Sequence, residues 1–306
     1  MKNFENFILE SKGISTICIT YRNTIFKDLE KSLISFDNIN QKIYQDVQTF
    51  RYNLNDSAFP ITNLIIVLNL YKYKENICNA LSDVKNSIVL NNNIDSLRIN
   101  FDIYINKLDY DFKFKIKSIL LHELVHCYEL YNIKIKNKSR PVSWSIGSIL
   151  PFLRKTIKNK EVLNILDLLY KSIKNEAASQ LHQYYDYKKD GKEYSEINDI
   201  INKLKSFKVD NISDDFIKDL ELVRYHIFNS LKHEKNNINY LKDLDKSFWN
   251  KSINKENVNN FISDLKDLFN SSARYIEKKI ILINKNLSEA HYGDENYIFE
   301  IEFLKD

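Results

Sequence analysis

Residues 97–131 read LRINFDIYINKLDYDFKFKIKSILLHELVHCYELY and carry the strongest structural signal in the chain. Apolar and polar residues alternate over 97–106, which is the pattern of a strand with one buried face. After Asp109 or Asp111, either of which can cap a helix with its side-chain oxygen, apolar residues recur at helical spacing to about Tyr131. We therefore expect a half-exposed strand that is followed directly by a helix.

The middle of this expected helix, ILLHELV at residues 119–125, is apolar on nearly all sides except at His122 and Glu123. A helix that is apolar all round belongs in the interior of a protein and not at its surface. Polar side chains in such an interior need partners, because a buried polar group without one is costly. The sequence therefore predicts a buried helix that carries a polar site.

The residues before this stretch alternate strand and helix signals. Only 4 of the 306 residues are Gly and 3 are Pro, so we expect few turns and long helices. Runs rich in β-branched residues predict strands at 14–21 and 61–71. Amphipathic patterns predict helices around 24–34 and 39–50.

The remainder of the chain, from about residue 143, has a helical pattern almost throughout. We expect breaks between helices near Pro151, around Gly191 and near residues 209–215. The predicted fold class is therefore α+β: a domain with a small mixed sheet, followed by a mainly helical lobe. The predicted domains are 1–138 and 139–306.

Charge and cysteine content restrict the class of protein. The 45 basic and 41 acidic residues are interspersed and give a net charge of only +4, so we expect neither a nucleic-acid partner nor a membrane surface. The 3 cysteines lack C-x-x-C spacing, which argues against a disulfide scaffold and favours a reducing compartment. Without a signal peptide or transmembrane run, a cytoplasmic location is expected. Nothing in the sequence indicates an oligomeric state.

The spacing of His122, Glu123 and His126 is suited to a metal site. Residues four apart lie one above the other on a helix, so both imidazoles can reach one ion. Zinc accepts imidazole nitrogen, and a catalytic zinc has three protein ligands and an open position for water. Glu123 is rotated by about 100° from His122, so it can reach that water and act as a general base. The cofactor expected from this pattern is Zn²⁺.

A third ligand is required, and two acidic residues are candidates. The Gly and His that would extend the motif in metzincins are absent, since residues 129 and 132 are Glu and Asn. Glu176 lies in a helical stretch whose apolar residues direct its carboxylate to the interior, where it needs a cation. Ala177 and Ala178 allow this helix to approach closely. Glu129, three residues after His126, is the local alternative, although a solvated or outer position fits it better.

These segments resemble the gluzincin branch of zinc metallopeptidases, whose thermolysin-like members pair H-E-x-x-H with a downstream N-E-x-x-S-D. The matching downstream segment here runs from Asn175 to Ser179, and Gln180 stands where the family has Asp. The resemblance implies that His122, His126 and Glu176 bind zinc and that Glu123 is the general base. It also implies that the strand at 97–106 is the sheet edge that binds an extended peptide. The gap between the two segments is longer than in thermolysin-like enzymes.

The function expected from these residues is peptide-bond hydrolysis by a zinc metalloendopeptidase with a peptide or protein substrate. Four residues are candidates to stabilise the oxyanion: Tyr184, Tyr185, His182 and His226. We expect Cys127 to fill the core. The alternative is a structural or interaction protein that retains a metallopeptidase-like fold, for example a bacteriophage virion or assembly component. It is suggested by Gln180 and by the large helical region without a specificity motif.

Overall fold

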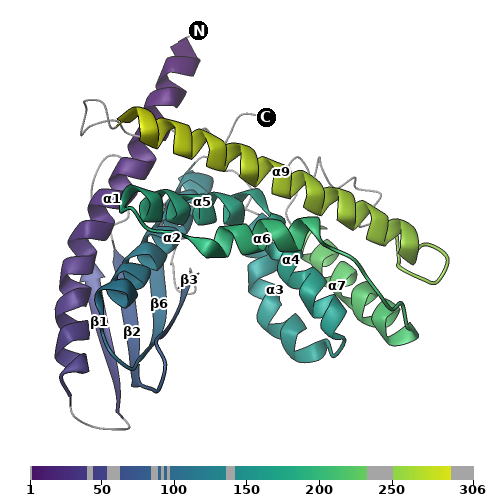
Figure 1. Cartoon of the computed structure of the whole chain (residues 1–306), viewed down its shortest axis with the longest axis horizontal. Coiled ribbons are helices and arrows are strands. Elements are labelled where there is room, and N and C mark those ends of the chain that lie inside the picture. Colours follow the sequence, from purple (N-terminus) through teal and green to yellow (C-terminus); the bar gives the residue numbers. More distant parts are fainter. Residues whose placement is uncertain are drawn as a thin grey trace. The chain divides into compact units, whose positions relative to one another are not determined.

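The computed structural model describes residues 2–39, 44–53, 63–83, 89–90, 93–94, 97–135, 142–232 and 251–290. The chain divides into two compact units, Met1–Lys136 with Glu289–Asp306, and Asn137–Ser288. The first unit holds a mixed four-stranded sheet and the second is helical (Figure 1). The predicted α+β class, with a small mixed sheet before a mainly helical part, is therefore confirmed.

The sheet of the first unit has the strand order β1-β2-β6-β3. Its strands are β1 (Gln45–Tyr52), β2 (Leu64–Lys72), β6 (Leu97–Ile105) and β3 (Ile77–Asp83). β2 and β6 are parallel, with Leu64 opposite Leu97, whereas β1 and β3 run antiparallel to their neighbours. Two short strands, β4 (Val89–Leu90) and β5 (Asn93–Ile94), form a separate pair.

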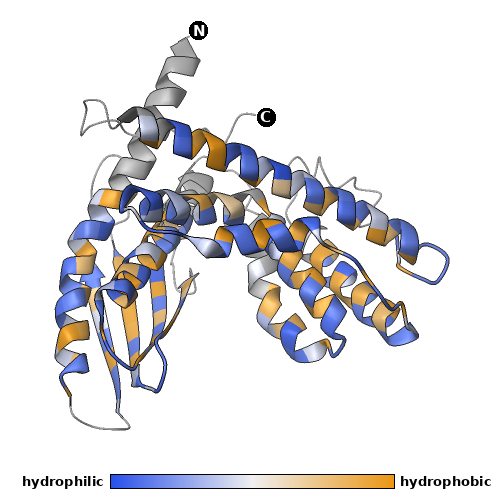
Figure 2. Ribbon diagram, viewed as in Figure 1, coloured by the Kyte–Doolittle hydropathy of each residue, from blue (hydrophilic) through white to orange (hydrophobic). Residues whose placement is uncertain are grey.

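The predicted alternation of the strand at 97–106 is confirmed. In β6 every second residue from Leu97 to Ile105 is buried, and the residues between them are exposed or half-buried. Apolar and hydrophilic residues alternate along the strands (Figure 2). The implied edge position is wrong, however, because β6 pairs with β2 on one side and β3 on the other. The edges of this sheet are β1 and β3.

The first unit also contains two long helices. α1 (Lys2–Asp37) packs against α2 (Tyr110–Ile135), and α2 packs against β3. An ion pair of 2.9 Å joins Lys113 of α2 to Glu30 of α1. Among the described helices, none combines the length and the apolar character that a membrane crossing requires.

Two predictions for the N-terminal part are wrong. Residues 14–21 belong to α1 and not to a strand, because from Cys18 onward buried residues recur along this helix three or four positions apart, at Cys18, Arg22, Ile25 and Leu29. Residues 45–50 belong to β1 and not to a helix, because alternate residues of this strand are exposed and half-buried. The predicted strand at 61–71 is confirmed over the described residues of β2, and the predicted helix at 24–34 lies within α1.

The second unit is a set of helices around α4 (Lys160–Ser172). α4 contacts α3 (Val142–Thr156), α5 (Lys174–Lys189), α6 (Ser195–Lys205) and α7 (Asp214–Lys232). The last described helix is α9 (Val258–Ala290). Its Phe269 meets Phe207 ring to ring at 4.8 Å, which connects it to the segment after α6.

The helix breaks in this unit were predicted in part. α5 ends before Gly191, whose φ of 70° favours glycine, and residues 206–213 separate α6 from α7, so both of these breaks are confirmed. The break expected near Pro151 is wrong, because Pro151 lies inside α3. Packing of α3 against α4 and α7 outweighs the one backbone hydrogen bond that proline removes.

Candidate metal centre

Helix α2 holds the histidines in a fixed position. Its first turn is capped by Asp109, whose side-chain Oδ1 accepts a hydrogen bond of 2.8 Å from the backbone N–H of Phe112. Asp109 is therefore the capping residue of the two that the sequence suggested. Leu120, Leu121 and Leu124 are completely buried, so the helix is fixed by packing where it carries His122, Glu123 and His126.

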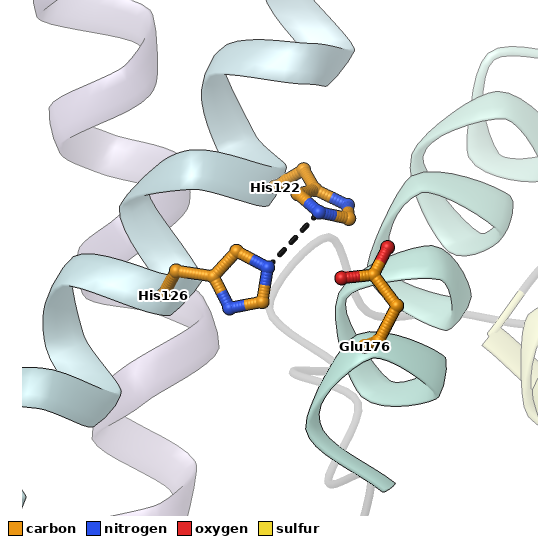
Figure 3. Close-up of side chains that lie close together, drawn as sticks. All are labelled: His122, His126 and Glu176. Atoms are coloured by element: carbon orange, nitrogen blue, oxygen red, sulfur yellow. Dashed lines mark hydrogen bonds between the residues drawn. The ribbon is translucent and has the colours of Figure 1, made fainter. Parts of the chain in front are cut away.

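His122 and His126 point toward one another from successive turns of α2 (Figure 3). Their Nε2 atoms are 3.0 Å apart, and the rings meet edge to face with centroids 4.7 Å apart. Two nitrogens bound to one tetrahedral zinc at the usual bond length would lie about 3.3 Å apart. Because the observed separation is close to this value, both imidazoles can bind one ion with little movement.

Glu176 lies in the first turn of α5 and is only 5% exposed. One ligand atom from each of His122, His126 and Glu176 lies within 4.8 Å of the other two, and all three side chains are buried. This group could hold a metal ion. Two imidazole nitrogens and one carboxylate oxygen are a donor set found in catalytic zinc sites, so the chemistry of the residues fits the expected cofactor.

Glu123 is held by a backbone group of the neighbouring strand. Its Oε2 accepts a hydrogen bond of 2.8 Å from the backbone N–H of Ser82 in β3, and the residue is 6% exposed. Since β3 is an edge of the sheet, this N–H points away from the ladder that β3 forms with β6. The carboxylate of Glu123 is thereby fixed between α2 and the sheet edge.

The oxyanion candidates have other described contacts. Tyr184 donates a hydrogen bond of 2.8 Å to Asn284, and Nδ1 of His182 is 2.8 Å from the backbone oxygen of Ala178. His226 meets the rings of Phe152 and Tyr225. Tyr185 is buried. An oxyanion role for any of these four residues stays a prediction.

Two further predictions concern residues beside the motif. Cys127 is completely buried, and this burial, with a smaller effect of the nearby Glu123, raises the pKa of its thiol well above the usual value. A buried neutral thiol is what a core position requires. The side chain of Glu129, the alternative third ligand, lies outside the described residues.

The structure adds a contact of Glu176 that the sequence did not indicate. Oε1 of Glu176 accepts a hydrogen bond of 3.1 Å from Nε2 of Gln180, and Oε1 of Gln180 in turn accepts one of 2.6 Å from Tyr194. Tyr194 precedes α6, fourteen residues after Gln180 in the sequence, and no periodic pattern links the two. The only general rule that pointed to this contact is that a buried tyrosine hydroxyl needs a hydrogen-bond partner.

Comparison with known proteins adds nothing to this geometry. No model of a known protein family matches the chain, and neither a curated protein nor a solved structure does so.

Proposed function

We propose that the protein is a zinc-dependent metallopeptidase in which His122, His126 and Glu176 bind Zn²⁺ and Glu123 is the general base. The observation that carries the proposal is the buried group of these three ligands, with a carboxylate placed directly after the first histidine. The same donors also occur around non-haem iron. Zinc is favoured because Glu123 supplies the base that hydrolysis needs.

The residues divide the work of hydrolysis between them. When bound, zinc would polarise the scissile carbonyl and lower the pKa of water to about 7. Glu123 accepts one proton as water adds to the carbonyl carbon. It then delivers this proton to the amine nitrogen as the C–N bond breaks, and it ends the cycle ionised. The Ser82 N–H holds the carboxylate in place during both transfers.

The substrate is proposed to bind along β3 and not along the strand at 97–106. β3 is an edge of the sheet, so an extended peptide can add to it through main-chain hydrogen bonds. Cys78, Ala80 and Ser82 are every second residue of β3, so their backbone groups point outward at the same edge. Peptide bound there would run beside Glu123, whose contact with Ser82 supports this choice of strand.

The proposal is tested with purified protein and a peptide library. We expect cleavage that a chelator stops and added zinc restores. Glu123→Gln should retain zinc and lose cleavage by about 100- to 10,000-fold, which is the usual contribution of a general base. The matched control is Glu75→Gln, which changes an exposed acid of the same unit and should retain both properties.

Three results would contradict the proposal. Unchanged turnover of Glu123→Gln would refute the role of Glu123. Metal-free wild-type protein that assembles into a ring or larger complex would favour the structural alternative, and bound iron would favour an oxygenase.

A further inference from the structure

A connected set of polar side chains adjoins Glu176 within the second unit, and its members range from buried Tyr194 and Gln183 through half-buried Gln180 to exposed Glu196. The hydroxyl of Tyr194 is 2.6 Å from Oε1 of Gln180, 3.0 Å from Oε1 of Gln183 and 3.1 Å from Oε2 of Glu196. Nε2 of Gln180 donates to Oε1 of Glu176 at 3.1 Å. Tyr194 and Glu176 are each only 5% exposed. Gln180 is therefore the link between the tyrosine and the carboxylate.

The direction of these hydrogen bonds follows from the chemistry of the groups. A phenol has one proton, and the shortest contact of Tyr194 is the one to Gln180. Burial, followed by the negative charge of Glu196, raises the pKa of Tyr194 far above its usual value, so the hydroxyl keeps its proton. With Oε1 of Gln180 accepting from the phenol, the amide N–H₂ group faces Glu176, which is an acceptor.

We propose that Gln180 is a positioning residue for Glu176, and that Tyr194 fixes the orientation of the Gln180 amide. The inference rests on the proposed function, in which Glu176 is a zinc ligand. It also gives a physical reason for the departure from the thermolysin-like pattern at this position. An Asp at residue 180 could not donate a hydrogen bond to the Glu176 carboxylate when ionised, whereas the amide of Gln180 does so.

Outer partners of metal ligands usually contribute 10- to 100-fold to metal affinity, because they orient the ligand. We therefore expect Gln180→Leu to weaken zinc binding by about 10- to 100-fold. Tyr194→Phe should weaken it in the same direction by less, since the amide of Gln180 remains. Zn²⁺ affinity is measured by competition with a chromophoric chelator on the full-length protein.

Gln183→Leu is the matched control. Gln183 is a buried glutamine on the same helix, its Oε1 lies 3.0 Å from the hydroxyl of the same tyrosine, and its described contacts do not include Glu176. The control should destabilise the metal-free protein about as much as Gln180→Leu while leaving zinc affinity near the wild-type value. The visible spectrum of bound Co²⁺ should change in Gln180→Leu and not in Gln183→Leu.

A double-mutant cycle tests the order of the chain from Tyr194 to Glu176. In the Gln180→Leu background, Tyr194→Phe should have no further effect on zinc affinity, because the described hydrogen-bonded route from Tyr194 to Glu176 has been removed. If Gln180→Leu fails to fold, Tyr194→Phe alone decides the question, since it removes a single oxygen.

The inference and the proposed function fail in different ways. Zinc affinity that is unchanged in Gln180→Leu, or equally weakened in Gln183→Leu, would overturn the positioning role while the metal centre stands. Wild-type protein that binds no zinc would overturn the proposed function and this inference with it.

Discussion

Helices α2 and α5 differ from α4 and α6 in what they bury. Of the eleven buried polar or charged residues that the structure describes, four lie on α2 and five on α5. They are Ser118, His122, Glu123 and His126 on α2, and Glu176, Ser179, His182, Gln183 and Asp186 on α5. The buried residues of α4 and α6 are all apolar, namely Val162, Ile165, Leu166, Leu168 and Leu169, and Ile197, Ile200, Ile201 and Leu204.

This difference separates positions that are needed for packing from positions that require another explanation. Amphipathic helices such as α4 and α6 gain stability by burying one apolar face. Polar groups in the interior cost free energy unless they are paired, so packing alone does not account for nine of them on two helices. The proposed metal would account for the three that converge, and the proposed role as a general base would account for Glu123 beside them.

The largest expected effect is the loss of zinc when a ligand is removed. His126→Ala should weaken zinc binding by more than the 10- to 100-fold that is typical of outer partners, because the ion would keep only two protein ligands. Cys127→Ala changes the adjacent buried residue of the same helix and should retain zinc. Equal zinc content in both variants would place the ion elsewhere.

The next effect concerns a helix that buries only apolar residues. Leu204 of α6 is completely buried, so Leu204→Ala should lower the free energy of unfolding by about 2 to 5 kcal/mol. Zinc affinity should stay close to the wild-type value. Chemical denaturation and chelator competition on the same sample check both statements. If Leu204→Ala lost zinc without losing stability, α6 would support the metal site and not the packing of the core.

Removal of the metal should destabilise the wild-type protein. A ligand that binds only the folded state contributes about 2.7 kcal/mol at a free concentration 100 times its Kd. Thermal unfolding with added zinc and with a chelator should therefore differ for the wild type and coincide for His126→Ala. A chelator effect of the same size in both proteins would show that it does not act through this site.

The smallest expected effect comes from the backbone of β3. Ser82→Pro removes the backbone N–H that donates a hydrogen bond to Glu123, and it removes no hydrogen bond of the ladder to β6. Hydrogen bonds to charged groups contribute about 1.5 to 3 kcal/mol, so peptide cleavage should fall by at least about 10-fold. Ser82→Ala keeps the N–H and should cleave normally. Equal rates for the two variants would exclude the backbone contact.

The parts of the molecule with a strong local period were predictable from the sequence. Alternation identified β6, and the apolar run with its cap identified α2. β1 was missed because both of its faces carry polar residues, such as Gln45 and Gln48, so that burial does not follow polarity. The start of α1 was missed because β-branched residues at 14–21 have strand propensity, and packing in the first unit overrides it.

Strand order and the contacts behind the site could not be predicted. The position of β6 inside the sheet depends on pairing with β2 and β3, which no local pattern encodes. The contact between Ser82 and Glu123 joins residues 41 apart in the sequence and uses a backbone group, so residue type gives no signal for it. By contrast, the spacing of His122 and His126 fixes their geometry within one helix, which is why it could be predicted.

The most direct test is the zinc content of untagged protein, measured by mass spectrometry next to the Glu176→Gln variant. We expect about one zinc per wild-type chain, as for one three-ligand site, and much less in the variant. Folded wild-type protein without zinc, or equal zinc in both proteins, would contradict the proposal that His122, His126 and Glu176 bind one ion.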